Sequence, residues 1–377
     1  MLAYIIRSLV HYRRTNLVVM LAVAISTSVI GGALIVGDSV RHTLRWMTEQ
    51  RLGQITHVLH SPGFFRQQMA EDMSGGNLAP LGGDCSFAPA ILITGSVEAK
   101  KENDRIRRAG NVSLLGLDAT GWQMLNNDGQ AAPAENELIL GYRTANEIGA
   151  SPGDEVSLWI EVPSSIPRDS LLGERDEVTI EIVLNVTRVL PEDVGASRFD
   201  LNPGQQLPYN AFLNLGLLQE RLGIEEIEVS RRNPVASPAK INAVLASCGD
   251  KEFTQKQADD FQRLVQESIT LTDLEMRIRT VEEDGFLSVE TERMILQDAL
   301  ADAVLQSASK LGFASAETTV YLSNEIYAVD RTDPDERYSM YSIIAGLPFE
   351  AAPPLGSIRL AEDIVLPPAV SGEASGD

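Results

Sequence analysis

The sequence predicts an α+β protein, in which a single N-terminal transmembrane helix is followed by a β-rich extracytoplasmic domain. Three observations lead to this prediction. Residues 17–36 form an apolar run without a charge, and most later segments alternate in polarity or are rich in β-branched residues. The charge is also unevenly divided, because residues 1–51 carry a net charge of +4 and the other residues carry −26.

Composition narrows the class of protein further. The chain has 377 residues, of which 44% are hydrophobic, so it is globular and long enough to bury a sizeable core. Its net charge of −22 repels phosphate backbones, so we expect no nucleic-acid partner. The two cysteines, Cys85 and Cys248, exclude a disulfide framework and a four-thiolate zinc site. Whether these two residues form one bridge stays open at this stage.

The run at residues 17–36 has the length of a membrane span, since a helix of that length extends about 30 Å. Arg7, Arg13 and Arg14 precede it without an acidic residue, so the positive-inside rule places the N-terminus in the cytoplasm. The main domain is then periplasmic and the chain lies in the bacterial inner (plasma) membrane. Two alternatives are a cleaved signal peptide, whose apolar region is usually shorter, and a buried helix of a soluble protein.

The flanks of this run also have a helical period. Residues 1–16 are basic, and the apolar spacing predicts a cytoplasmic amphipathic segment that lies on the lipid bilayer. In residues 37–57, Val40, Leu44 and Met47 continue the helical period and predict a stalk that rises from the membrane. Residues 58–377 are expected to form the extracytoplasmic α+β domain.

Strands dominate the first part of that domain. β-Branched residues or alternation predict strands at residues 90–97, 111–117, 137–140, 155–162 and 177–190. Ser151-Pro-Gly-Asp154 predicts a tight turn before one of them. Loops are expected at residues 72–83 and 231–240, which are rich in Gly, Pro and polar residues.

Helices are fewer and lie later. One is predicted at residues 213–222, and Thr254 with Gln257 forms a capping box that opens another. Residues 274–279 and 286–290 alternate around Glu283-Asp284-Gly285, which predicts a hairpin. A further amphipathic helix begins near Leu296 and ends near Gly312.

The sequence contains one internal similarity. Residues 85–99 and 111–118 resemble residues 313–328 and 341–348, and a Gly-Leu pair occurs at 116–117 and again at 346–347. This similarity indicates a second, truncated repeat from about residue 312. The alternative is a chance likeness of two strand–loop–strand segments.

Residues that carry chemistry are scarce. The sequence has neither a phosphate-binding G-x-x-x-x-G-K-[ST] or G-x-G-x-x-G motif nor a G-x-S-x-G nucleophile motif. Its four histidines are His11, His42, His57 and His60. His57 and His60 have a spacing that suits metal ligands on a helix, but their segment is extended in pattern. The acidic runs at 225–228 and 282–284 are expected to be solvated turns. We therefore predict no catalytic, cofactor-binding or metal-ligating residue, no cofactor and no enzymatic activity.

Three segments resemble FtsX-like ABC transporter permeases with a MacB-type periplasmic domain. The first is the apolar helix that ends in Val36-Gly-Asp-Ser-Val-Arg41, and the second is residues 111–125, with a strand followed by Gly116-x-Asp118. The third is residues 137–160, which contain Ala145, Gly149 and the Pro152-Gly-Asp154 turn before a strand. The resemblance is good over residues 1–160 and loose beyond them.

The resemblance implies partners that this sequence does not contain. Members of that family have three or more further transmembrane helices and contact a separate ATPase subunit on the cytoplasmic face. Because no second apolar run of sufficient length follows, the chain is expected to be a truncated permease or one piece of a split one. Its partners would be the ABC ATPase subunit, other permease transmembrane segments and the lipid bilayer.

Three functions are therefore compared. The first is a permease-type membrane component of an ABC transporter, for export or mechanotransmission, driven by a separate ATPase subunit. The second is a single-pass, membrane-anchored periplasmic binding or scaffold protein. The third is a secreted enzyme that uses carboxylates alone. The resemblance favours the first.

Overall fold

The computed structural model divides the chain into two compact units, Met1–Leu274 (unit 1) and Glu275–Asp377 (unit 2). The sequence predicts an extracytoplasmic domain over residues 58–377 with a second, truncated repeat from about residue 312, whereas the division between the two units lies after residue 274. The structure describes residues 2–346 apart from a set of short and longer gaps. These gaps are residues 79–80, 82, 101–105, 126–128, 162–178, 194, 203–205, 230–235, 250–253, 283–284, 292, 294–295 and 328–337.

Unit 1 begins with two helices, α1 (Leu2–His11) and α2 (Arg13–Leu52). α2 is one continuous helix of 40 residues, and none of its residues is buried. Within the described residues it is the one helix that is long and apolar enough to cross a membrane. The predicted stalk to residue 57 is too long, because Gly53 ends the helix with a φ of +60° and His57 already belongs to the first strand.

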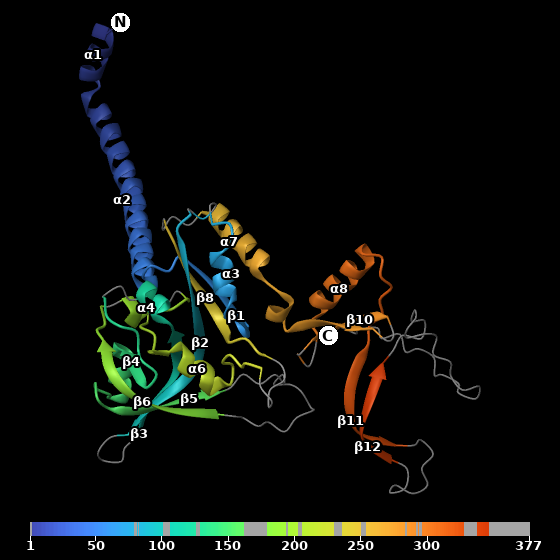
Figure 1. Cartoon of the computed structure of the whole chain (residues 1–377). Helices are drawn as coiled ribbons and strands as arrows, with labels where there is room; N and C mark the ends of the chain where they lie inside the picture. Colours follow the sequence, from blue (N-terminus) through green and yellow to red (C-terminus); the bar gives the residue numbers. More distant parts are fainter. Residues whose placement is uncertain are drawn as a thin grey trace. The chain divides into compact units, whose positions relative to one another are not determined.

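The described strands of unit 1 form one eight-stranded sheet in the order β1-β8-β2-β3-β7-β4-β6-β5 (Figure 1). β5 also pairs with β2, so the strands from β2 to β5 close into a ring of six, and β8 and β1 extend from β2 outside it. β3 with β7 and β4 with β6 are parallel. The strands are β1 (His57–Arg66), β2 (Cys85–Lys100), β3 (Ile106–Leu117), β4 (Glu137–Gly141), β5 (Glu155–Glu161), β6 (Thr179–Leu190), β7 (Asn210–Asn214) and β8 (Lys240–Cys248).

Gly95 lies where the long strand β2 changes partner. Before it, residues 85–90 pair with β8, and from Gly95 onward the strand pairs with β5. A Cβ at this position would lie 2.7 Å from the Trp159 carbonyl oxygen and equally close to a methyl group of Leu114. Only glycine permits this approach of the two backbones, and a bulge in the β2–β3 pairing follows directly.

The two faces of the sheet have separate apolar cores. The larger core takes side chains from all six ring strands, so it fills the inside of the ring. The smaller core lies on the other face around Trp122 and Phe212, whose rings meet edge to face at 5.5 Å. Ile55, directly after α2, is buried in this second core.

Short helices cover these cores. They are α3 (Met69–Ser74), α4 (Ala119–Leu125), α5 (Tyr142–Ile148), α6 (Leu215–Leu222), α7 (Gln255–Ser268) and the 3₁₀ turns η2 (Gly195–Arg198) and η3 (Leu271–Leu274). The capping box of α7 is present as predicted, with Thr254 and Gln257 satisfying each other's backbone amides. α6 begins two residues later than predicted, because Leu213 and Asn214 complete β7 and Asn214 caps the helix.

Cys85 and Cys248 form a disulfide, which answers the question that the sequence left open. They are directly paired residues of the antiparallel strands β2 and β8, with their Cα atoms 4.2 Å apart. The bond joins positions 163 residues apart and therefore closes a very long loop.

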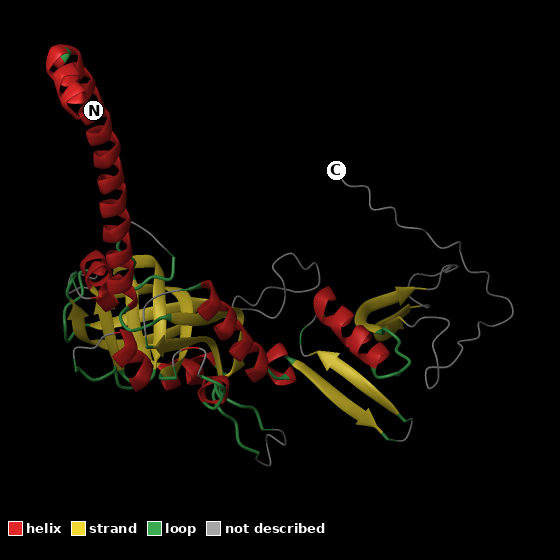
Figure 2. Cartoon of the chain, turned by 90° about the horizontal axis from the view of Figure 1, so that it is seen from above, coloured by secondary structure: helices red, strands yellow, loops and turns green. Residues whose placement is uncertain are grey.

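Unit 2 contains two hairpins and a helix (Figure 2). β9 (Met276–Val281) pairs with β10 (Phe286–Thr291), α8 spans Asp298–Lys310, and β11 (Thr319–Tyr327) pairs with β12 (Tyr338–Gly346). The predicted hairpin, helix and strand–loop–strand are therefore present. The segment after residue 346 lies outside the described residues.

The predicted strands of unit 1 are confirmed as β2 to β6, and Asp154 accepts the Ser151 amide in the predicted turn. β8 was not predicted, although six of its consecutive residues from Ile241 are fully or almost fully buried. A strand buried on both faces has no alternation, so its pattern carries no period-two signal.

A buried ion pair ties η3 to β1. Asp273, whose side chain is 2% exposed, accepts hydrogen bonds from the backbone amide and the guanidinium of Arg66 and from Thr270. Burial by itself raises the pKa of Asp273, but the hydrogen bonds from Arg66 and Thr270 outweigh it and hold this pKa below its ordinary value.

We expect Asp273→Asn to destabilise unit 1 by about 3 kcal/mol near pH 7, because it leaves the Arg66 charge without its main partner. A carboxyl group whose pKa is lowered by folding contributes its full stabilisation at pH values above the pKa that it has in the unfolded chain, about 4. This stabilisation is lost as the pH falls through the lower pKa that the group has in the folded chain. The difference in unfolding free energy between the wild type and Asp273→Asn should therefore become smaller near pH 3. Urea unfolding followed by tryptophan fluorescence measures it, since Trp46, Trp122 and Trp159 all lie in unit 1.

The matched control is Asp72→Asn. Asp72 also contacts Arg66, at 3.1 Å, but its side chain is 44% exposed, so its removal should cost at most about 1 kcal/mol. Equal deficits for the two variants, or a deficit at Asp273 that does not change with pH, would contradict this account.

Candidate functional site at the base of the α2 helix

The end of α2 docks on unit 1 through the peptide backbone. Gly53 follows the helix, and a Cβ on it would lie 2.6 Å from the Met124 carbonyl oxygen and 2.7 Å from that of Leu125. The Gln54 amide donates a hydrogen bond to the same Met124 oxygen at 2.7 Å. The last carbonyls of a helix have no partner within it, so the chain leaving α2 supplies a donor that the C-terminus of α4 requires.

The N-terminus of α4 is held independently. Asp118 lies just before the helix, and its side chain accepts the Gly121 amide at 2.7 Å. Burial raises the pKa of Asp118, and its hydrogen bonds to backbone amides oppose this effect. α4 is thus fixed at both ends, by Asp118 at one and by Gln54 at the other.

A second contact lies on η2. A Cβ at Gly195 would lie 2.2 Å from the Gln50 carbonyl oxygen, within the last turn of α2. η2 is itself bound to the ring, because the buried Asn210 amide of β7 donates to the carbonyl oxygens of Ala196 and Phe199. Glycine at 195 therefore allows α2 to rest directly on the backbone of a turn that β7 holds in place.

Thr56 completes the junction from α2 to the sheet. Its amide donates to the Ala246 carbonyl at 2.8 Å, and its hydroxyl accepts the Cys248 amide at 2.9 Å. Next to it, His57 stacks on Phe261 of α7 with a ring separation of 4.7 Å. Burial lowers the pKa of His57, and its Nδ1 lies 3.0 Å from the Thr56 hydroxyl oxygen.

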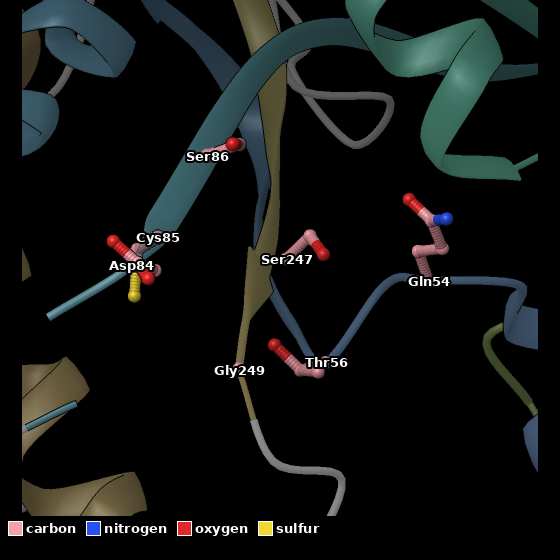
Figure 3. A pocket seen from close by; sticks show the side chains of 7 residues that line it. All are labelled: Gln54, Thr56, Asp84, Cys85, Ser86, Ser247 and Gly249. Atoms are coloured by element: carbon pink, nitrogen blue, oxygen red, sulfur yellow. The ribbon is translucent and has the colours of Figure 1, made fainter. Parts of the chain in front are cut away.

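A polar hollow of about 440 Å³ adjoins this junction (Figure 3). Ser86 and Ser247 come from paired positions on β2 and β8, and Gln54 and Thr56 come from the segment between α2 and β1. The wall is completed by Asp84, Cys85 and Gly249. The described residues that line the hollow offer hydroxyl, amide and carboxylate groups.

The residues considered as chemical candidates do not come together. His57 and His60 lie on the strand β1 and are an odd number of residues apart, so they point to opposite faces. His11 ends α1 and His42 is exposed on α2. Among the described residues, no group of three or more His, Cys, Asp or Glu side chains could hold a metal ion.

The acidic runs agree only in part with the expected turns, because Glu282 lies in a turn but Ile227, within the run at 225–228, forms an antiparallel bridge with Ser237. Glu226 and Glu228 are exposed, and so is Glu282, whereas Glu283 and Asp284 lie outside the described residues. Glu225 differs, because it is half-buried and its Oε2 has no hydrogen-bond partner among the described residues.

Sequence reasoning missed the docking residues. The end of α2 at a glycine is a recognisable signal, and it places Gly53 correctly as a helix terminus. Nothing local marks Gly195 or Met124, because their importance comes from a helix far away in the sequence.

The chain was compared with protein families, curated proteins and solved structures. No protein-family model matches the sequence, and no curated protein matches it. Among solved structures, the chain resembles "a domain of a putative Permease protein" from Porphyromonas gingivalis, with 9% identity and a TM-score of 0.32. The alignment covers 67% of this chain and 98% of that one.

We expect Gly53→Ala and Gly195→Ala to release α2 from unit 1, because each added methyl group would collide with a carbonyl oxygen. Trypsin should then cleave after Arg51 at least about ten times faster, since the segment opens locally without unfolding the ring. Gel analysis of timed digests measures this rate on the detergent-solubilised chain.

Two glycines provide matched controls. Gly129 also has a positive φ, +73°, and Gly110 does not, and neither has an atom within 4 Å of an added Cβ. Gly129→Ala controls for backbone strain at Gly53, and Gly110→Ala controls for the methyl group at Gly195. If the controls accelerate cleavage as much as the test variants, the docking contacts are not what holds α2.

Proposed function

We propose that this chain is a permease-type membrane component of a transporter, and that a separate ATPase subunit drives it. α2 is the transmembrane anchor, its N-terminus is cytoplasmic, and the ring of unit 1 lies outside the cytoplasm. One observation carries the proposal. One unbroken helix contains both the apolar span and the last turn that docks on the ring. A simple tether does not need such a continuous connection.

The orientation is supported from both ends of unit 1. Arg7, Arg13 and Arg14 flank the apolar run on the side that the positive-inside rule assigns to the cytoplasm. On the other side, the disulfide between Cys85 and Cys248 requires an oxidising compartment to form and persist. Both features favour an extracytoplasmic ring.

The proposed mechanism is mechanical. With residues 17–36 in the bilayer, residues 37–52 extend the helix about 24 Å beyond it. A tilt of α2 caused by nucleotide-driven closure of the partner would move Gln50 and Gly53, and with them η2 and α4. Because η2 is bonded to β7, the movement would reach the ring as a rigid-body shift.

The alternative is a single-pass anchored binding protein, and the polar hollow beside the junction favours it. Its hydroxyl and amide groups could bind a polar ligand. The two functions differ in their dependence on other transmembrane helices, which the permease requires and the binding protein does not.

The first test is the topology. In spheroplasts, external trypsin should cut within residues 58–274, and the fragments should be recognised by antibodies to unit 1. Opening the cells should be needed before the N-terminal arginines become accessible. Protection of the ring from external protease would overturn the proposal.

The second test is partner dependence. Ala22, Ser26 and Ala33 share one face of α2, and small residues permit close packing of another helix. Ser26→Leu and Gly32→Leu should leave insertion intact, because both raise hydrophobicity. Both should reduce co-purification with the other transmembrane segments or the ATPase, by about tenfold if packing is lost.

Ala24→Leu, on the opposite face of α2 from Ser26, is the matched control for Ser26→Leu. Outside the adjoining turns of α2 itself, no atom of the described residues lies within 4 Å of a Cβ at Gly32, so a leucine there has space within this chain. Equal recovery of the wild type and all three variants would favour the anchored binding protein.

A further inference from the structure

The helix α1 has an exposed apolar face. Ile5, Ile6 and Leu9 lie on one side of the helix, because residues three and four positions apart are neighbours on its surface. Their exposed fractions are 57%, 54% and 53%, so the described residues of the chain leave more than half of each side chain uncovered. The opposite side carries polar groups at the spacing i, i+3, i+4 and i+7, on Tyr4, Arg7, Ser8 and His11. α1 is therefore an amphipathic helix.

The basic residues near this face have no acidic partner. Arg7 lies on α1, Arg13 and Arg14 lie in the first turn of α2, and the first acidic residue of the sequence is Asp38. Among the described residues, none forms an ion pair with these three arginines. Arg14 precedes the apolar run at Leu17 by three residues, which places it about 4.5 Å outside the span, at the depth of lipid headgroups.

Tyr12 separates α1 from α2 and belongs to neither helix (Figure 1). In a continuous helix the Arg13 amide would bond to the Leu9 carbonyl oxygen, but here the Asn16 side-chain amide donates to that oxygen at 3.3 Å. The hydrogen-bond ladder is thus interrupted at this point, and α1 can take a direction different from that of α2. When residues 17–36 span a bilayer, α1 can therefore lie on the bilayer surface.

From these observations we propose that α1 is a docking element for anionic phospholipids at the cytoplasmic membrane surface. Ile5, Ile6 and Leu9 enter the boundary between headgroups and acyl chains. The guanidinium groups of the three arginines bind the phosphates and acidic headgroups. Lipid is the occupant that the geometry favours, because the apolar face ends eight residues before the start of a helix that itself requires lipid.

The length of α1 explains why headgroup charge matters. α1 has ten residues, and a helix this short is marginally stable in water by itself. Its few apolar side chains bind a neutral bilayer weakly, so attraction between the arginines and anionic lipids decides whether α1 docks. The inference rests on the anchor and orientation of the proposed function. It goes beyond them by naming the lipid class that fixes the inner end of α2.

Cysteine labelling of the full chain in nanodiscs tests the lipid preference. Both native cysteines form the disulfide, so an introduced cysteine is the one free thiol. A membrane-impermeant maleimide is applied to Ile6→Cys on the apolar face and to Tyr4→Cys on the polar face. The protection of position 6 relative to position 4 should be at least about tenfold greater in an equal mixture of phosphatidylcholine and phosphatidylglycerol than in phosphatidylcholine alone.

Arginine variants test which groups read the headgroup charge. Arg7→Gln and Arg14→Gln should each lower the protection of position 6 about fivefold in the mixed nanodiscs, because each arginine contributes about that factor near an anionic surface. Neither variant should change the protection in phosphatidylcholine alone. Arg45→Gln is the matched control, because Arg45 is an exposed arginine of α2 beyond the apolar run and should have no effect on α1. A loss of protection in Arg45→Gln that equals the other two would overturn the assignment to Arg7 and Arg14.

A cysteine inside the span separates a failure of this inference from a failure of the proposed function. Ile25 is 64% exposed in the chain, so lipid is what shields Ile25→Cys from the reagent. Rapid reaction at position 25 shows that the span is not inserted and overturns the anchor together with the lipid proposal. With position 25 shielded, equal protection of position 6 in the two lipid compositions overturns the lipid proposal alone. Protection in native membranes but in neither nanodisc also overturns it, because a protein partner then covers α1.

Discussion

The strand β2 is the constraint on which unit 1 depends. It pairs with β8 over residues 85–90, with β3 from Ala90 onward and with β5 from Gly95 onward. β2 takes part in all three pairings. The ring can therefore close only if β2 bends and changes its partner from β8 to β5 partway along its length. Gly95 allows this bend because nothing larger fits between Leu114 and the Trp159 carbonyl. The long-range pairing then buries one face of six strands in a common core.

The junction at α2 rests on a different kind of interaction. An amphipathic helix usually binds a domain through a stripe of side chains, but α2 has no buried residue and is held by its last turn and the segment that follows. The contacts include hydrogen bonds and close backbone approaches at Gly53, Gln54 and Gly195, and Leu52 also packs on the core around Trp122. Hydrogen bonds and close backbone approaches are directional and leave little freedom to slide.

The hairpins β2–β3 and β11–β12 show how much a common element depends on its surroundings. In unit 1 the side chains of Leu114 and Leu115 are buried on opposite faces, because the ring core covers one and the core around Trp122 covers the other. In unit 2 the corresponding strand β12 has Ile343 largely exposed. The local sequence forms a hairpin in both places, and the burial is supplied by elements that are distant in sequence.

Local patterns were sufficient for the fold class and for some of the elements. The charge-free run of α2, the strands β2 to β6, the Ser151–Asp154 turn and the capping box at Thr254 each follow from interactions within a few residues, which periodicity and capping preferences register directly. They also indicated correctly that the protein is α+β, with one apolar N-terminal helix before a β-rich region.

Only the tertiary structure decided how these elements are joined. Ring closure by β2 and β5, the bond between Cys85 and Cys248, and the pairing of Arg66 with Asp273 all connect residues far apart in the chain. The same is true of Gly195, whose neighbour Gln50 lies on α2. Contacts of this kind cannot be recognised from the local pattern of a single sequence. Many other residues of suitable size or charge would fit the same local pattern equally well. The geometry of the folded chain selects among them.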